Sequence, residues 1–327
     1  MVYRKLGNTG IKVSAFGFGS MNFGLVNDLK QATELVKIAV ENGINFFDNA
    51  ETYGSGKAEE IIGQAIKDLG YNRSDLVLTT KIFYGRGEVR KVMGPNATGL
   101  SRKHIIEGLK ASLAAMQTDY VDVVLAHRYD ANTPLEETVR AFNWVIDQGL
   151  AFHWGTSEWT VQQVEEAWEV ANKLNLVGPI CEQPQYNLLA REKVEKEFLP
   201  LYKTYGTGLT TWGPLASGVL TGKYSGGKVP EGSRLTTSLF QQYKGYLLTE
   251  DKLAKIDSLK PLAEELGCSM AQLCLAWTYK NEHVSTIMLG ASKPEQLLDC
   301  LKAVQYVDKL TPEVLAKIES IMQTKPK

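Results

Sequence analysis

Cysteine is scarce in this 327-residue sequence, which limits how the fold can be stabilised. The four cysteines form no Cys-x-x-Cys pair and lie in apolar surroundings. Disulfide frameworks and cysteine-based metal sites need closely spaced pairs. We therefore predict buried free thiols and no metal centre. The cysteines are Cys181, Cys268, Cys274 and Cys300.

An excess of charge of either sign is also missing. The chain carries 36 basic and 37 acidic residues, for a formal net charge of -1 at pH 7. Such a balance gives no global field that would attract nucleic acid or an anionic membrane. No stretch approaches the roughly 18 apolar residues of a spanning helix, and the first residues lack the apolar core of a signal peptide. We expect a cytoplasmic protein without nucleic-acid partners, in which any charged ligand is held by a local site.

What the sequence does contain is a regular alternation of short β-prone runs and amphipathic stretches. Its length alone suggests about two domains, but α/β barrels use such a length for one. The helical stretches cover residues 30–43, 101–116, 133–149 and 160–174. The strand candidates are residues 15–20, 45–50, 76–81, 121–126, 151–157, 180–183, 208–213 and 284–289.

Several helix ends carry recognisable signals. Ser101 and Thr133 suit N-cap positions, and Pro134 suits a first helical position. Gly43 and Gly149 suit the C-terminal caps of their helices. These signals support the helical assignments at both ends.

Alternating strands and helices predict parallel pairing, and the simplest closed solution is a (β/α)8 barrel. A single domain would then span residues 1–327, with residues 1–13 forming a β-hairpin across the barrel floor. A doubly wound open sheet is the alternative. Such a sheet usually has a Gly-x-Gly-x-x-Gly turn after its first strand, and glycines 17, 19 and 24 have the wrong spacing for it.

On a barrel, the residues that follow the strands line the mouth of the active site. A lone charged residue there is more often a solvated loop residue. Asp48 and Lys81 differ, because each ends an apolar run on adjacent strands, where an unpaired charge would be costly. We predict that they pair. The residues collected in this way are Asp48, Tyr53, Lys81, His127, Ser157, Gln183 and Trp212.

Tyr53 follows the first of these strands within the run "FFDNAETYG". If it leans over the Asp48–Lys81 pair, the ammonium should lower the tyrosine pKa and make the hydroxyl a usable proton donor. His127 could hold a substrate oxygen by a hydrogen bond. This set lacks a hydrolase layout and metal-ligand spacing, but it suits carbonyl protonation, for which a nicotinamide cofactor is the natural complement.

A series of motifs along nearly the whole chain resembles the aldo-keto reductase superfamily. The motifs are "FFDNAETYG", "LTTKIF", "LAHR", "WGTSEW", "CEQPQYN", "TWGPLASGVLTGKY" and "LGASKPEQL". The run "GLSRKHIIEGLKASL" is most similar to the branch that contains β subunits of voltage-gated potassium channels and their plant, fungal and bacterial relatives. The resemblance implies a barrel that binds NADP(H) across its C-terminal face and reduces aldehydes and some ketones. The catalytic tetrad of the family falls on Asp48, Tyr53, Lys81 and His127. Channel β subunits often have asparagine at the last position, so His127 favours catalysis.

The resemblance also implies a set of cofactor contacts. Ser157 and Gln183 would bind the amide group of the nicotinamide, and Trp212 would pack against the face of the nicotinamide ring. NADPH would be preferred over NADH. Two departures are Glu158, where channel β subunits usually have arginine, and Cys300, where an asparagine is expected. The further implied contacts are Ser20, Met21 and Asp48, then Gly213, Pro214, Leu215, Ser217, Lys223 and Arg234 along the pyrophosphate, and Gly290, Ser292 and Gln296 at the adenosine, with Lys293 beside them.

The sequence leaves three functional questions open. The glycine-rich stretch 213–248 predicts a loop that closes over the cofactor. The stretch 84–99 is a specificity loop of mixed polarity, compatible with aromatic or small aliphatic aldehydes. The competing function is a cytosolic potassium channel β subunit that senses redox state through bound NADP(H), and a tetramer is plausible for either function.

Overall fold

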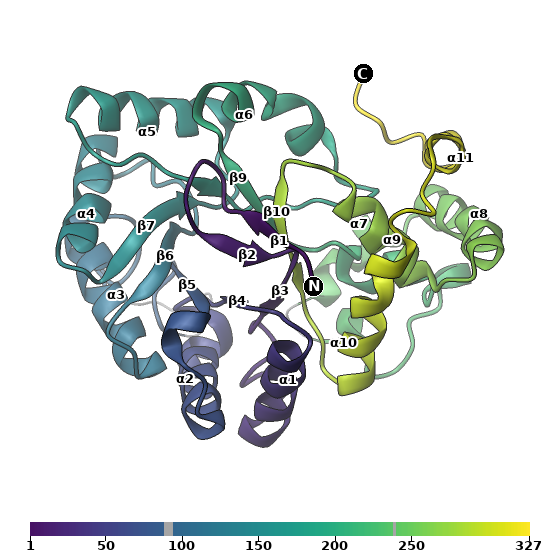
Figure 1. Cartoon of the computed structure of the whole chain (residues 1–327), viewed down its shortest axis with the longest axis horizontal. Helices are drawn as coiled ribbons and strands as arrows, with labels where there is room; N and C mark the ends of the chain where they lie inside the picture. The colour runs from purple at the N-terminus through teal and green to yellow at the C-terminus, as the bar shows by residue number, and fades with distance from the viewer. Residues whose placement is uncertain (88–93, 238–239) are drawn as a thin grey trace. The chain divides into compact units, whose positions relative to one another are not determined.

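A computed structural model of the chain describes residues 1–87, 94–237 and 240–327. Its centre is a closed barrel of eight parallel strands in the order β10-β3-β4-β5-β6-β7-β8-β9 (Figure 1). The barrel closes where β10 pairs with both β3 and β9. The predicted (β/α)8 barrel is therefore confirmed and the open sheet is excluded. The strands are β3 (Phe16–Gly19), β4 (Phe46–Asp48), β5 (Val77–Ile82), β6 (Val121–Ala126), β7 (Ala151–Thr156), β8 (Cys181–Glu182), β9 (Gly208–Thr211) and β10 (Val284–Leu289).

The predicted hairpin is present as β1 (Tyr3–Lys5) and β2 (Lys12–Ser14), which pair antiparallel. Arg4 Nη1 donates to the Val284 carbonyl at 2.6 Å, at the first residue of β10. Gly7, between the two strands, has φ +56°, and a Cβ there would lie 2.7 Å from the Gly208 nitrogen at the start of β9. These contacts place the hairpin against the N-terminal ends of the strands, which is the floor of the barrel.

Helices follow the strands as the periodicity predicts. Ser101 caps its helix by accepting from the His104 amide at 3.2 Å, and Gly43 and Gly149 have the left-handed backbone of a C-terminal cap. Thr133 is not a cap, because Pro134 occupies that position and the Thr133 hydroxyl donates to Asp130 at 2.8 Å. The helices beside the barrel strands are α1 (Leu29–Glu41), α2 (Lys57–Leu69), α3 (Arg102–Met116), α4 (Leu135–Asp147), α5 (Val161–Lys173) and α6 (Leu199–Tyr205).

The contacts divide the chain into two compact units. The first contains the barrel and comprises residues 1–184, 198–211 and 283–297. The second comprises residues 185–197, 212–282 and 298–327. The single-domain assignment stays a prediction. The second unit includes α7 (Lys244–Leu247), α8 (Glu250–Leu266), α9 (Met270–Tyr279) and α11 (Pro312–Met322), and α10 (Pro294–Leu301) runs from the first unit into it.

The stretch 213–248 differs from the long irregular loop that its composition suggests. Short 3-10 turns occupy Ala216–Thr221, Ser225–Gly227, Arg234–Thr236 and Gln241–Tyr243. Gly226, Gly227 and Gly232 all have positive φ and open space around the position of a side chain. The described part of this stretch thus holds several short turns and α7, and the left-handed backbone at these three positions favours glycine.

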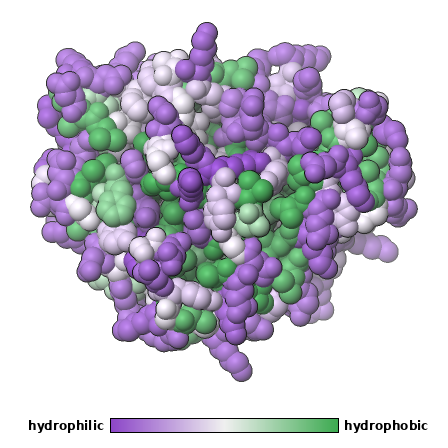
Figure 2. All heavy atoms as spheres, in the orientation of Figure 1, coloured by the Kyte–Doolittle hydropathy of each residue, from purple (hydrophilic) through white to green (hydrophobic). Residues whose placement is uncertain are grey.

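Polar side chains cover much of the surface that Figure 2 shows. On the face drawn in Figure 2, hydrophilic side chains predominate and apolar residues are scattered among them. No helix of the described ranges combines the length and apolar character needed to cross a membrane. All four cysteines are free, and three of them are buried.

Candidate active site

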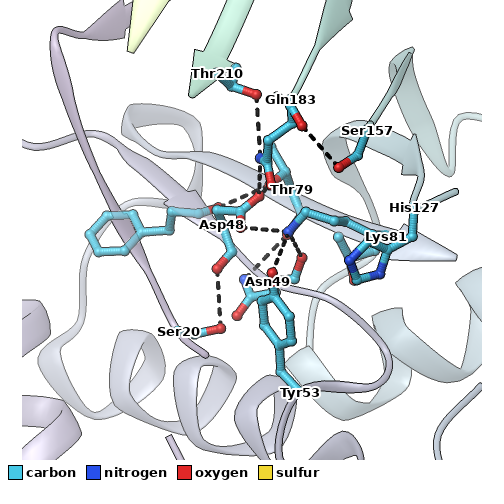
Figure 3. A network of polar contacts seen from close by, with 12 residues as sticks. Ser20, Asp48, Asn49, Tyr53, Thr79, Lys81, His127, Ser157, Gln183 and Thr210 are labelled. Carbon is cyan, nitrogen blue, oxygen red and sulfur yellow. Dashed lines mark hydrogen bonds and ion pairs between the residues drawn. The ribbon is translucent and has the colours of Figure 1, made fainter. Parts of the chain in front are cut away.

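The centre of the site is a buried ion pair. Asp48 is the last residue of β4, and Lys81 lies one residue before the end of the neighbouring strand β5. The two strands pair in parallel, so both side chains reach the same end of the barrel interior (Figure 3). Lys81 Nζ lies 2.5 Å from Asp48 Oδ2, and the two side chains are 1% and 4% exposed. The predicted pairing is confirmed.

The Lys81 ammonium also contacts Tyr53. Nζ donates to the Tyr53 hydroxyl at 3.1 Å and to the Asn49 carbonyl at 2.8 Å. Together with Asp48 these acceptors use all three N–H groups of the ammonium. Tyr53 begins the 3-10 turn Tyr53–Gly56, and Gly54 has φ +56° in a position where a Cβ would lie 2.7 Å from a backbone carbonyl. The glycines after Tyr53 therefore permit the tight turn that brings its hydroxyl to Lys81.

The other carboxylate oxygen of Asp48 is held by neutral donors. Thr79 Oγ1 and Gln183 Nε2 both donate to Asp48 Oδ1 at 2.9 Å. Gln183 Nε2 also lies 3.3 Å from Thr210 Oγ1. We did not predict Thr79, although it lies two residues before Lys81, and side chains at that spacing share a face of a strand. Asp48 is thus fixed by two side chains of β5 and by Gln183, which directly follows β8.

The pKa values of the central groups follow from this burial. Burial opposes the charged form of Lys81, but the attraction of Asp48 and Tyr53 outweighs it and raises the Lys81 pKa. Burial raises the pKa of Tyr53, and Lys81 only partly offsets that effect. The prediction of a lowered tyrosine pKa is therefore wrong, because the loss of water around the phenol outweighs the nearby ammonium. Tyr53 keeps its proton at neutral pH.

His127 follows β6 and is 7% exposed. Its ring packs edge-on against Tyr53 and Tyr84, with ring centroids 6.1 and 5.0 Å apart. Burial, together with the positive charges of Lys81 and Arg128, holds the His127 pKa well below its usual range. The imidazole is therefore neutral at physiological pH, with one donor and one acceptor nitrogen. Its Nδ1 is buried and has no hydrogen-bond partner among the described residues.

Several predicted cofactor residues lie beside this centre. Ser157 Oγ donates to the Gln183 carbonyl at 3.0 Å, and Ser20 Oγ donates to the Asp48 carbonyl at 3.1 Å (Figure 3). Met21 follows Ser20 and is partly buried. The strand ends thus bring Ser20, Asp48, Ser157 and Gln183 together.

A second group of predicted residues follows β10. Gly290 is exposed directly after the strand. The backbone nitrogen and the hydroxyl of Ser292 both donate to Gln296 Oε1, at 2.9 and 3.1 Å. Lys293 lies between them and is exposed. The predicted adenosine residues are therefore neighbours at the N-terminal end of α10.

Trp212, predicted at the nicotinamide face, begins a segment of the second unit that also holds the predicted pyrophosphate residues, Pro214 among them. Gly213, Ala216 and Ser217 have φ of +64°, +47° and +57°. Left-handed backbone in residues other than glycine costs about 1–3 kcal/mol each and is found at ligand sites. A Cβ added at Gly218 would lie 2.8 Å from Lys223 Nζ, so this ammonium lies over the strained turn. Leu215 lies within the turn, and Arg234 stacks on Phe240 with Cζ 4.2 Å from the ring centroid.

The two departures from the family pattern have distinct surroundings. Glu158 is partly buried and has a left-handed backbone with φ +60°. Cys300 is buried in α10, and burial raises the pKa of its thiol to about 12. It is therefore a neutral thiol in place of the expected amide.

A further buried network positions the loop after β5. Glu51 Oε1 accepts from the Phe83 and Gly85 amides, both at 2.7 Å, and lies 3.2 Å from His104 Nε2. Tyr84, which packs on His127, lies between these two anchored amides. Residues 88–93 of the predicted specificity loop lie outside the described residues. Among the described residues, no cluster of histidine, cysteine or acidic side chains could hold a metal ion.

Comparison with known proteins gives a family. Residues 15–323 match the model of the Aldo/keto reductase family. A probable voltage-gated potassium channel subunit beta from Oryza sativa subsp. japonica is 55% identical and covers 100% of this chain and 98% of that protein. One from Arabidopsis thaliana is 54% identical with the same coverage. A putative voltage-gated potassium channel subunit beta from Schizosaccharomyces pombe is 50% identical, covering 99% of this chain and 94% of that protein.

Proposed function

Because the chain belongs to the Aldo/keto reductase family, we propose that it is an NADPH-dependent reductase that converts aldehydes and some ketones to alcohols. Tyr53 is the general acid of this reaction. One observation carries the proposal: the buried Lys81 ammonium bonds at once to the Asp48 carboxylate and the Tyr53 hydroxyl. A phenol held on a cation in a barrel mouth is equipped to lose a proton.

The raised pKa of Tyr53 is compatible with this role. A general acid must hold its proton until the transition state, and Tyr53 does so at neutral pH. As the proton passes to the carbonyl oxygen, the ammonium 3.1 Å away stabilises the phenolate that forms. Asp48 keeps Lys81 in place and charged. The neutral imidazole of His127 donates a hydrogen bond to the same carbonyl oxygen and orients it.

Bound NADPH would supply a hydride to the carbonyl carbon, and Tyr53 would give the proton to the carbonyl oxygen. The chain's residues fit such a cofactor. The strained turn at Ala216 and Ser217, with the Lys223 ammonium over it, suits a phosphate. The residues proposed to hold the cofactor are Ser20, Met21, Asp48, Ser157, Gln183, Trp212, Gly213, Pro214, Leu215, Ser217, Lys223, Arg234, Gly290, Ser292 and Gln296.

The preference for NADPH over NADH rests on the groups available to a 2′-phosphate. Ser292, Lys293 and Gln296 cluster after β10. Arg234 of the second unit is proposed as a further partner of the phosphate. Charged and hydrogen-bonding partners of this kind favour a phosphate. Replacement of Lys293 by Met is expected to weaken NADPH binding and leave NADH binding unchanged.

A second function is favoured by the relatives. Three proteins at 50–55% identity over nearly their whole length are named as potassium channel β subunits. The chain could therefore serve in the cytoplasm as a tetrameric subunit of such a channel, with bound NADP(H) as a redox sensor. This role uses the same barrel and the same cofactor residues.

The test that separates the two functions is NADPH consumption with a panel of aldehydes, including para-nitrobenzaldehyde and methylglyoxal, beside titration of NADPH binding. Turnover supports the reductase. Tight NADPH binding with no turnover of any carbonyl moves the assignment to the sensor. Copurification with the cytoplasmic domain of a voltage-gated potassium channel, measured with and without NADPH, then tests the channel role directly.

A further inference from the structure

Arg128 is a cation at the mouth of the barrel that the proposed reaction does not use. It follows His127 directly and is partly buried. Its Nη1 donates to the His127 carbonyl and lies 3.4 Å from Ser157 Oγ. Both contacts use the same nitrogen. Within residues 1–87, 94–237 and 240–327, no group accepts from its Nε or Nη2, and no carboxylate lies within ion-pair distance.

Three other arginines that are buried or partly buried behave differently. Arg73 pairs with Asp122 at 2.7 Å, Arg86 pairs with Glu59, and Arg191 pairs with Glu195 at 2.8 Å. A partly buried guanidinium without an anion is costly, which explains why these side chains are paired. Arg128 differs from these three arginines, and its position in the proposed active site indicates that a ligand supplies the anion.

The surroundings of Arg128 connect it to the proposed acid. Its Cζ lies 5.9 Å from the ring centroid of Tyr84, and the Tyr84 ring packs edge-on against His127 at 5.0 Å. His127 in turn packs against Tyr53 at 6.1 Å. Burial raises the pKa of Tyr53, and the positive charge of Arg128 is among the effects that oppose this rise. The guanidinium and the Tyr53 hydroxyl therefore belong to one electrostatic neighbourhood of the barrel mouth.

We propose that Arg128 binds the carboxylate of an anionic substrate whose aldehyde carbonyl is reduced at Tyr53. The planar fork of a guanidinium binds carboxylates through two parallel hydrogen bonds, and Nε and Nη2 form one such pair of donors. Tyr84 beside it favours an aromatic ring between the two functional groups. The preferred class is thus aromatic aldehydes that carry a carboxylate. This inference rests on the proposed reductase function for the reaction, but its binding step does not.

The experiment measures kcat/KM for the ortho, meta and para isomers of carboxybenzaldehyde and for their methyl esters. The isomers vary the distance between the two groups, and each ester removes only the charge. At least one isomer should be preferred over its ester by roughly tenfold, equivalent to about 1.4 kcal/mol. Arg128→Met should abolish that preference. Arg140→Met is the matched control, because Arg140 is exposed on α4, pairs with Glu136, and its loss removes the same net charge.

Three outcomes overturn the inference: no isomer is preferred over its ester, Arg128→Met keeps the preference, or Arg140→Met loses it equally. A weaker NADPH affinity in Arg128→Met with an unchanged preference would instead assign the guanidinium to the cofactor, and also overturns it. Calorimetric titration with benzoate and with methyl benzoate compares their binding affinities and so measures carboxylate binding without turnover. Benzoate binding that depends on Arg128 in a protein that reduces no carbonyl would retain the site and reject the proposed reductase.

Discussion

Replacing Lys81 by Met removes one partner of a buried ion pair and keeps a side chain of similar length. Asp48 then retains only the neutral donors Thr79 and Gln183 on one oxygen, and its other oxygen loses the ammonium at 2.5 Å. Removing one partner of a buried pair costs about 3–5 kcal/mol, because the remaining charge is left uncompensated. We expect a loss of this size in the free energy of unfolding at neutral pH.

The assay is urea unfolding followed by tryptophan fluorescence, in a double-mutant cycle with Asp48→Asn. The double variant contains no unpaired charge, so it should be less destabilised than the sum of the two single variants. Lys57→Met is the control, since Lys57 pairs with Glu60 at 2.7 Å but both side chains are largely exposed. Its cost should stay below about 1 kcal/mol. A Lys81→Met loss equal to that control, or strict additivity in the cycle, would refute the reasoning.

Three other predictions follow from buried groups and from the turns of the second unit. The folded protein holds the pKa of His127 well below its usual range, so the imidazole stays neutral where the unfolded chain binds a proton, below about pH 6.5. The free energy of unfolding of the wild type should therefore fall relative to that of His127→Asn below this pH. The difference should grow by up to about 1.4 kcal/mol per pH unit. Urea midpoints measured across this pH range check the difference, and parallel curves would reject it. Glu51→Ala leaves the Phe83 and Gly85 amides without their acceptor, which should lower the free energy of unfolding by about 1–3 kcal/mol for each amide. Hydrogen exchange of these two amides should be faster in Glu51→Ala than in the wild type. The increase should be far smaller in Glu51→Gln, whose side chain keeps an acceptor oxygen. Amides of residues 213–248 should gain protection from hydrogen exchange when NADPH is added, and no gain would remove the proposed closure.

The barrel could be predicted because each strand is a short apolar run between turn signals. The Asp48–Lys81 pair could be predicted as well, since two charges at the ends of adjacent buried strands have few alternatives to pairing. Both inferences depend on local pattern and on the cost of burying charge.

The features that could not be predicted from the sequence depend on packing between distant segments. The pKa of Tyr53 rises because of how much water the assembled site excludes, which no local pattern reveals. That Arg128 has no carboxylate partner in the described part of the chain becomes visible only once the neighbouring strands are placed. Thr133 is not the N-cap because the helix begins one residue later than predicted, with Pro134 in that position.

The most direct test of the central claim compares Tyr53→Phe with the wild type in NADPH binding and in aldehyde reduction. Tyr246→Phe serves as control, since Tyr246 is 73% exposed. The account predicts that Tyr53→Phe binds NADPH nearly as tightly as the wild type and reduces no aldehyde, while Tyr246→Phe keeps full turnover. Retained turnover in Tyr53→Phe would contradict the assignment of Tyr53 as the proton donor.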